Sequence, residues 1–160
     1  MIERTLVLLK PDTVQRCFMG EIISRFEKAG FKIVGCKMVW IDKDFSKQHY
    51  EEHVEKDFYP GLENMITDGP VLAMVLEGVD AIENVRKMVG ATEPKASAPG
   101  TIRGDYAHIS YGHADENKIG VKNLIHASDI PENAKKEVSL WFTEKELHSY
   151  KTVHDAHILE

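Results

Sequence analysis

The segment NLIHASD, residues 123–129, holds the side chains best suited to nucleophilic chemistry. His126 stands there among polar neighbours, and Ser128 and Asp129 are expected to cap a following helix and fix the turn that carries the histidine. Glu137 lies inside that helix, where it could accept a hydrogen bond from one imidazole nitrogen. The other nitrogen would then be free to attack an electrophile. A surface histidine in a capped turn is the simpler alternative.

A second group of residues is suited to holding a chain of phosphates. Arg86 ends a predicted helix, and Thr92 and Arg103 lie in the expected loop of residues 91–105. Guanidinium groups give paired donors to phosphate oxygens. Because the sequence has no GxxxxGK[S/T], GxGxxG or HExxH motif, side chains must supply the positive charge. Lys10, at the end of an apolar strand, is a further candidate, and solvated surface charges are the alternative for all of these residues.

Aromatic and histidine side chains cluster in the segment of two predicted helices that contains Tyr50, His53 and Phe58. An exposed aromatic ring there could stack on a nucleobase without reading its edge, whereas a place in the core is the alternative for Phe58. His49 and His53 are one helical turn apart, a spacing that could suit a metal. Because the sequence places no third ligand nearby, we predict no metal site formed by protein side chains alone.

Apolar runs and amphipathic stripes predict the elements that must position these residues. Strands are expected at residues 5–9, 31–40, 70–76 and 106–111, and helices at 20–29, 42–53, 61–66, 81–89 and from Pro131 onward. Gly30 and Gly90 stand where helices should end. The order predicts an α+β, ferredoxin-like βαββαβ fold with an antiparallel sheet covered by helices. No linker or repeat is seen, so we expect one domain over residues 1–160.

The overall composition narrows the classes of function. The chain has 160 residues and a formal net charge of −6, which disfavours a general nucleic-acid binder. Cys17 and Cys36 lack a metal-type spacing and fit a reducing compartment. The sequence shows neither an apolar run long enough to span a bilayer nor the pattern of a signal peptide. We therefore expect a cytoplasmic protein with no membrane or nucleic-acid partner.

Taken together, these segments resemble the nucleoside diphosphate kinase family. The resemblance runs from TLVLLKPD at residues 5–12 to LWF at 140–142, and it is most specific in PGTIRGD at 99–105 and NLIHASD at 123–129. It implies transfer of the γ-phosphate of a nucleoside triphosphate, such as ATP, to a nucleoside diphosphate. The implied mechanism is ping-pong through a phosphorylated His126, and it maintains nucleoside triphosphate pools. The resemblance further implies Mg²⁺ with the nucleotide and a homo-oligomer, usually a hexamer built from dimers.

The resemblance also implies roles for individual residues. Glu137 corresponds to the carboxylate that orients the histidine, Tyr50 to a residue near the transferred phosphate, and Phe58 to the aromatic that stacks on the base. Ser128 corresponds to a residue beside the histidine. The residues implied to contact the ribose or the phosphates are Lys10, His53, Arg86, Thr92, Arg103 and Asn123.

The sequence departs from the family pattern in three places. Ile130 replaces a residue that is usually small, and Asp57 replaces a common proline before Phe58. The chain between residues 105 and 123 is longer than in common eukaryotic members and resembles archaeal-type members, with a hairpin extension expected around 113–118. Two other classes remain open: a ferredoxin-like nucleic-acid binder, whose aromatic strand pattern is missing here, and a module that binds nucleotides without chemistry.

Overall fold

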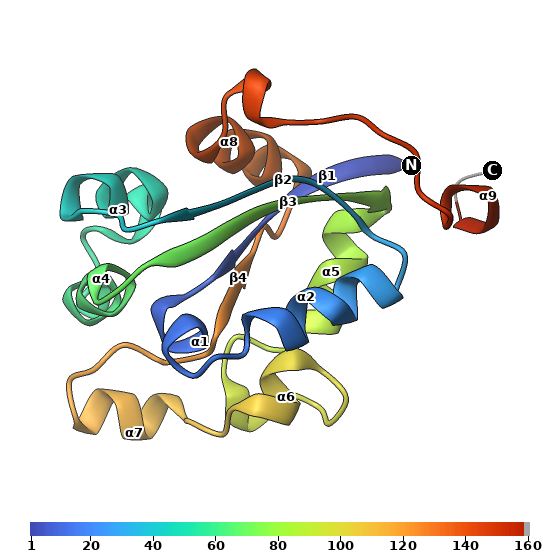
Figure 1. The fold of residues 1–160 in the computed structure, drawn as a ribbon. Coiled ribbons are helices and arrows are strands. Elements are labelled where there is room, and N and C mark those ends of the chain that lie inside the picture. The colour runs from blue at the N-terminus through green and yellow to red at the C-terminus, as the bar shows by residue number, and fades with distance from the viewer. Residues whose placement is uncertain (159–160) are drawn as a thin grey trace.

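A four-stranded antiparallel sheet forms the centre of the computed structural model, which describes residues 1–158 (Figure 1). Its strands are β1 (Ile2–Leu9), β2 (Lys32–Val39), β3 (Val71–Val79) and β4 (Ile125–Ala127), in the order β2-β3-β1-β4. β1 lies between β3 and β4 and is antiparallel to both. This order and pairing confirm the predicted ferredoxin-like fold.

Helices cover both faces of the sheet because successive side chains of a strand point to opposite sides. Leu6 and Leu8 of β1 face a core shared with α3 (Lys43–His49), α4 (Tyr59–Thr67) and α8 (Pro131–Trp141). Val7 and Leu9 face a second core shared with α2 (Met19–Lys28) and α5 (Ala81–Val89). All four side chains are fully buried, which explains why β1 reads as a continuous apolar run.

Short helices and turns complete residues 1–158. Four are α-helical and three are 3₁₀ turns: α1 (Pro11–Gln15), α6 (Ile102–Tyr106), α7 (Tyr111–Glu116), α9 (Asp155–Ile158), η1 (Glu51–His53), η2 (Pro94–Ala96) and η3 (Glu144–Glu146). Gly30 and Gly90 follow α2 and α5 with φ of 86° and 92°, as the predicted helix ends require. No helix among the described residues has the length and apolar character needed to cross a membrane.

The prediction of a fourth strand at residues 106–111 is wrong. This segment joins α6 to α7, and Ser110 begins α7 by accepting a hydrogen bond from the His113 backbone at 3.2 Å. The place beside β1 is taken by residues 125–127, with Val7 opposite Ala127 and Leu9 opposite Ile125. Burial decides the pairing, since Ile125 and Ala127 are both buried.

Two loop predictions also need correction. The extension around residues 113–118 is not a hairpin, because α7 covers its first four residues. The expected loop of residues 91–105 contains η2 and the start of α6, and Thr101 caps α6 by accepting a hydrogen bond from the Gly104 backbone at 3.0 Å. Arg103 therefore lies on a helix, whereas Thr92 lies in the loop before η2.

Candidate active site

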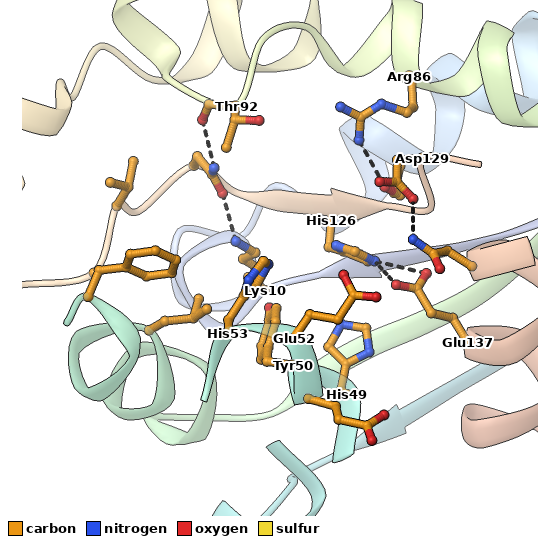
Figure 2. Close-up of a pocket in the computed structure, with 18 of the residues that line it drawn as sticks. Lys10, His49, Tyr50, Glu52, His53, Arg86, Thr92, His126, Asp129 and Glu137 are labelled. Atoms are coloured by element: carbon orange, nitrogen blue, oxygen red, sulfur yellow. Dashed lines mark hydrogen bonds and ion pairs between the residues drawn. The ribbon is translucent and has the colours of Figure 1, made fainter. Parts of the chain in front are cut away.

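A pocket of about 600 Å³ gathers every site residue that the sequence analysis singled out for a catalytic or binding role. Four parts of the fold form its wall: the strand end after β1, the segment from α3 to α4, the end of α5, and β4 with α8. Figure 2 shows Lys10, Tyr50, His49 and Glu137 around His126, with Arg86 and Thr92 on the opposite side. The lining residues predicted from sequence are Lys10, Tyr50, His53, Phe58, Arg86, Thr92, Arg103, Asn123, His126 and Glu137.

His126 lies in β4, opposite Leu8 of β1, and is held by Glu137 of α8. Its Nε2 lies 3.1 Å from both carboxylate oxygens of Glu137. Because a carboxylate only accepts hydrogen bonds, Nε2 carries the proton and Nδ1 of the neutral ring keeps its lone pair. The sequence analysis expected this hydrogen bond from one imidazole nitrogen to Glu137, and it leaves the lone pair of Nδ1 free.

Glu137 is itself held by Ser128. The Ser128 hydroxyl donates to Glu137 Oε2 at 2.5 Å and accepts a hydrogen bond from the Leu6 backbone at 3.3 Å. Burial works to raise the pKa of Glu137, but the hydrogen bonds from His126 and Ser128 outweigh it, so the net pKa is lowered. The carboxylate therefore stays ionised and keeps its role as an acceptor for His126.

The capping role predicted for Ser128 and Asp129 is wrong. α8 begins after Ile130, and no side chain caps its first turn. Ser128 faces Glu137 instead, and Asp129 Oδ1 accepts hydrogen bonds from the Ile130 backbone at 2.9 Å and from Asn133 Nδ2 at 2.8 Å. The Ile130 side chain is exposed and does not line the pocket, so this departure from the family pattern leaves the pocket intact.

A hydrogen-bonded chain connects Lys10, Asn123 and Thr92 (Figure 2). Lys10 Nζ donates to Asn123 Oδ1 at 2.7 Å, and Asn123 Nδ2 donates to the Thr92 carbonyl at 2.8 Å. Burial, followed by the charge of Arg103, lowers the pKa of Lys10 to about 7. A nearby negative charge stabilises the protonated form of a lysine, so a phosphate in the pocket would raise the pKa of Lys10 again.

Strained backbone holds Asn123 and His126 in one pocket. Leu124, between them, has a φ of 72°, which is rare for a residue with a side chain. Its backbone is pinned from both sides: its N–H donates to Asp12 Oδ2 at 3.0 Å, and its carbonyl accepts from Thr13 Oγ1 at 2.5 Å. Asp12 and Thr13 are therefore positioning residues. The sequence analysis missed them, although the KPD motif already contained Asp12.

Arg103 differs from Arg86 in how much of it is free for a ligand. Arg103 is 4% exposed, and the backbone carbonyls of Gly90, Ala91, Asn123 and Ile125 accept hydrogen bonds from it at 2.5–3.2 Å. Burial lowers its pKa to about 10. Arg86 donates to the Ala127 carbonyl at 3.1 Å. Arg103 thus ties together two loops of the pocket wall, and Arg86 keeps more of its donor capacity.

Tyr50 places a buried hydroxyl in the pocket. Among the described residues this oxygen has no hydrogen-bond partner, and burial raises the pKa of the phenol above its usual value. A buried polar group without a hydrogen-bond partner destabilises the fold by roughly 1–3 kcal/mol. Its presence here suggests that a bound ligand supplies the missing partner. The position fits the role near a transferred phosphate that the family resemblance implies.

His49 completes a cluster that the sequence analysis did not foresee. Ligand-type atoms of His49, His126 and Glu137 lie within 4.8 Å of one another, a set that could hold a metal ion. However, Trp141 Nε1 donates to His49 Nδ1 at 3.1 Å, which leaves the proton of the neutral ring on Nε2. Burial, then the neighbouring His126, lowers the pKa of His49 to about 3. His49 therefore presents an N–H donor here and lacks the free lone pair that a metal needs.

The outer end of the pocket has a different character. Phe58, directly before α4, is 53% exposed, which excludes the alternative that it is a core residue. Leu62 of α4 and residues 119–121 line the same pocket, as do Tyr111 and Asp115 of α7. Asp57, beside Phe58, is exposed. The contributions of α7 and residues 119–121 were missed. The sequence indicated these contributions only through the extra length of this segment, because the segment contains no motif.

Comparisons with known proteins agree on one family. The sequence model described as Nucleoside diphosphate kinase matches residues 3–147. The nucleoside diphosphate kinase of Pyrococcus furiosus is 54% identical over 149 residues, which are 93% of this chain and 88% of the relative. That of Carboxydothermus hydrogenoformans is 50% identical over 159 residues, 99% of this chain and 100% of the relative.

Solved structures give the same result. A nucleoside-diphosphate kinase from Borrelia burgdorferi, described as a transition state mimic with bound vanadate and ADP, superposes with a TM-score of 0.95. It is 38% identical in sequence, and the match covers 99% of this chain and 97% of the other. A halophilic nucleoside diphosphate kinase from Halobacterium salinarum, in complex with CDP, has a TM-score of 0.89 at 43% identity, with 100% of both chains covered.

Proposed function

This chain belongs to the nucleoside diphosphate kinase family of phosphotransferases, and on that premise we propose that Nδ1 of His126 carries the transferred phosphate. The observation that carries the proposal is the pair of 3.1 Å contacts between Nε2 and the Glu137 carboxylate, which leave Nδ1 unprotonated in a pocket lined by cationic side chains. Two related structures hold the nucleoside diphosphates ADP and CDP, and the corresponding triphosphates would supply a phosphorus atom of the kind that such a nitrogen attacks.

In the first half of the reaction, Nδ1 of neutral His126 attacks the γ-phosphorus of a nucleoside triphosphate in line. The N–P bond forms as the bond to the β-phosphate oxygen breaks, and the nucleoside diphosphate leaves with that electron pair. The positive charge that develops on the ring is shared with Glu137 through Nε2–H. In the second half, a β-phosphate oxygen of another nucleoside diphosphate attacks the phosphohistidine and restores neutral His126.

Charge stabilisation in this scheme comes from Lys10 and Arg86. Phosphoryl transfer demands mainly positioning and charge stabilisation from the protein, and these two cations face the pocket from opposite walls. The Tyr50 hydroxyl, which has no partner among residues 1–158, is available to the transferred phosphate. Thr92 and His53 line the pocket beside these groups and are proposed to contact the phosphates. Asn123 is proposed to contact the ribose together with Lys10.

The nucleobase is proposed to lie at the outer end of the pocket, stacked on the exposed ring of Phe58. The inner end holds the cationic groups, so the phosphates lie inward and the base outward. Stacking binds any base, because every base has a π-face. This arrangement suits an enzyme that must accept several nucleotides at one site.

Magnesium is proposed to bind together with the nucleotide. Asp129 lines the pocket, and its Oδ2 has no hydrogen bond among the described residues, whereas Oδ1 accepts two. A carboxylate oxygen of this kind fits Mg²⁺, which binds proteins through few carboxylates and keeps waters or phosphates as its other ligands. When bound, the ion would neutralise charge on the phosphate oxygens.

A homo-oligomer, usually a hexamer in this family, is proposed as the working form. β2 is an edge strand, and Met38 and Trp40 at its end are 52% and 68% exposed. Exposed apolar groups on an open strand edge favour association. Cytoplasmic location is proposed as well, with support from the two exposed free cysteines, Cys17 and Cys36, which fit a reducing compartment.

Steady-state kinetics test the proposed function. With ATP as donor and GDP as acceptor, we expect GTP formation whose double-reciprocal plots are parallel lines, the pattern of a covalent carrier. His126→Ala should abolish turnover while nucleotide still binds. Intersecting lines would mean that both nucleotides are bound at once, and they would contradict a phosphorylated histidine.

A further inference from the structure

Helix α7 forms one wall of the pocket from its phosphate end to its base end. Tyr111 and Asp115 lie one turn apart on α7, Ile119 follows the end of the helix at Glu116, and all three line the pocket. Tyr111 lies at the phosphate end, because its backbone N–H donates to Glu93 Oε1 at 2.8 Å, next to Thr92. Ile119 and Gly120 lie at the other end, where their backbone contacts Gly61 of α4.

A close contact of two glycines joins this wall to the one that carries Phe58. A Cβ on Gly120 would meet the Gly61 carbonyl oxygen at 2.7 Å, and a Cβ on Gly61 would meet the Gly120 nitrogen at 3.0 Å. Phe58 precedes Gly61 by less than one turn of α4, so the base end of the pocket lies between Phe58 and the segment that follows α7. Asp115 lies in the last turn of α7, directly before that segment, and lines the same pocket.

The wall is well fixed although much of it is exposed. Ala114 is buried, Ser110 caps the helix, and the Lys95 backbone donates to the Ile109 carbonyl at 3.2 Å. The Asp115 side chain is exposed and has no hydrogen bond or ion pair within residues 1–158. Its backbone carbonyl accepts from Lys118 at 3.1 Å, which fixes where the side chain starts.

We propose that Asp115 is a specificity-determining residue that reads the edge of the nucleobase and favours guanine. This rests on the proposed function, because it requires the base at the Phe58 end. A carboxylate accepts hydrogen bonds only. Guanine alone among the common bases presents two adjacent donors, the ring N1–H and the 2-amino group, which match the two carboxylate oxygens. Adenine and cytosine place an acceptor nitrogen beside their amino group, and that lone pair would face the carboxylate.

The test uses phosphorylated enzyme, prepared with ATP and Mg²⁺ and separated from nucleotide. Its second-order rate of dephosphorylation is measured with GDP, IDP and ADP. IDP keeps N1–H but lacks the 2-amino group, so it isolates one of the two proposed hydrogen bonds. We expect GDP to react about tenfold faster than IDP, a ratio within the range for one hydrogen bond to a charged acceptor.

Asp115→Asn turns one acceptor into a donor. It should bring the ratio of the GDP and IDP rates to near 1. It should also raise the rate with ADP, since the amide can accept from the amino group of adenine and donate to its N1. A gain with ADP cannot come from structural damage. Glu116→Gln removes the same charge at the next residue, which does not line the pocket, and should leave all three rates unchanged.

The outcomes distinguish a failure of base recognition by Asp115 from a failure of the phosphotransfer on which it rests. Equal rates with GDP and IDP in the original protein, or an unchanged ratio in Asp115→Asn, would overturn the reading of the base while leaving the phosphotransfer mechanism standing. Failure of the original protein to take up phosphate from ATP would overturn both. A uniform loss with all three nucleotides in Asp115→Asn would show that the residue supports the wall without selecting the base.

Discussion

The inner and outer ends of the pocket are built in opposite ways. Around His126 most of the polar groups are buried or half-buried and are bonded to one another, through Glu137, Ser128 and the chain from Lys10 to Thr92. At the outer end, Phe58 and Asp115 are exposed, and neither side chain belongs to a hydrogen-bonded network among the described residues. Preorganised groups stabilise charge best where the reaction occurs. The contrast supports the proposal that chemistry takes place at the inner end and that the outer end selects the nucleotide.

The inner end should be the more sensitive of the two, and Glu137→Gln is its strongest test. Glutamine can donate to the imidazole as well as accept from it, so it no longer fixes the Nε2–H tautomer. We expect kcat to fall by about 10²–10⁴. Single-turnover phosphorylation by ATP measures this step directly. Ser128→Ala, which removes only the support of Glu137, should cost about tenfold. A loss below threefold in Glu137→Gln would show that the ring is held by other contacts.

Lys10→Met removes a buried cation from the same end. Loss of one such charge should lower the rate of phosphoryl transfer by about 10²–10³. Lys122→Met serves as the control, because Lys122 is exposed and does not line the pocket. Comparable kinetics in the two variants would mean that Lys10 makes no contact with the reacting phosphates.

The low pKa of Lys10 also predicts a pH dependence of binding. Burial depresses this pKa to about 7 in the free protein, and an anionic nucleotide should raise it, so binding takes up a proton above pH 7. Affinity should therefore fall as pH rises, by about tenfold between pH 7 and pH 8.5. Calorimetry in two buffers of different ionisation enthalpy measures the uptake. Lys10→Met should show none, and equal proton uptake in that variant would locate the titrating group elsewhere.

Phe58→Ala tests the outer end and should have the smallest effect. An exposed stacking surface contributes at the low end of the measured range for base stacking, so we expect KM to rise about fivefold for every nucleotide, with little change in kcat. Titration of KM with ADP, GDP and CDP checks this. If kcat fell as far as in the Lys10 variant, the separation of the two ends would be wrong.

The inner end was largely predictable from the sequence, because its residues come in short motifs. The continuous apolar run of β1 placed Lys10 at a strand end, and the order of strands and helices gave the ferredoxin-like fold. The partnership of His126 with Glu137 followed from one histidine before a helix that carries a carboxylate. Roles for these residues in turnover stay predictions until the variants are measured.

The errors fall where long-range contacts override local pattern. Residues 106–111 alternate like a strand, but residues 125–127 bury more apolar surface beside β1 and take the place. The roles of Asp12 and Thr13 depend on the left-handed backbone of Leu124, more than a hundred residues away in sequence. The glycine contact that closes the outer end joins Gly61 to Gly120. The spacing of residues along the sequence does not predict such contacts.

The proposed mechanism depends on a phosphate bound to His126, and a labelling experiment detects it. The protein is mixed with Mg²⁺ and γ-labelled ATP without an acceptor, and the labelled protein is then tested for acid and base stability before unlabelled GDP is added. We expect an acid-labile, base-stable label that is absent in His126→Ala and is transferred completely to GTP. A protein that binds ATP but takes up no label, or one whose label survives the loss of His126, would contradict the account.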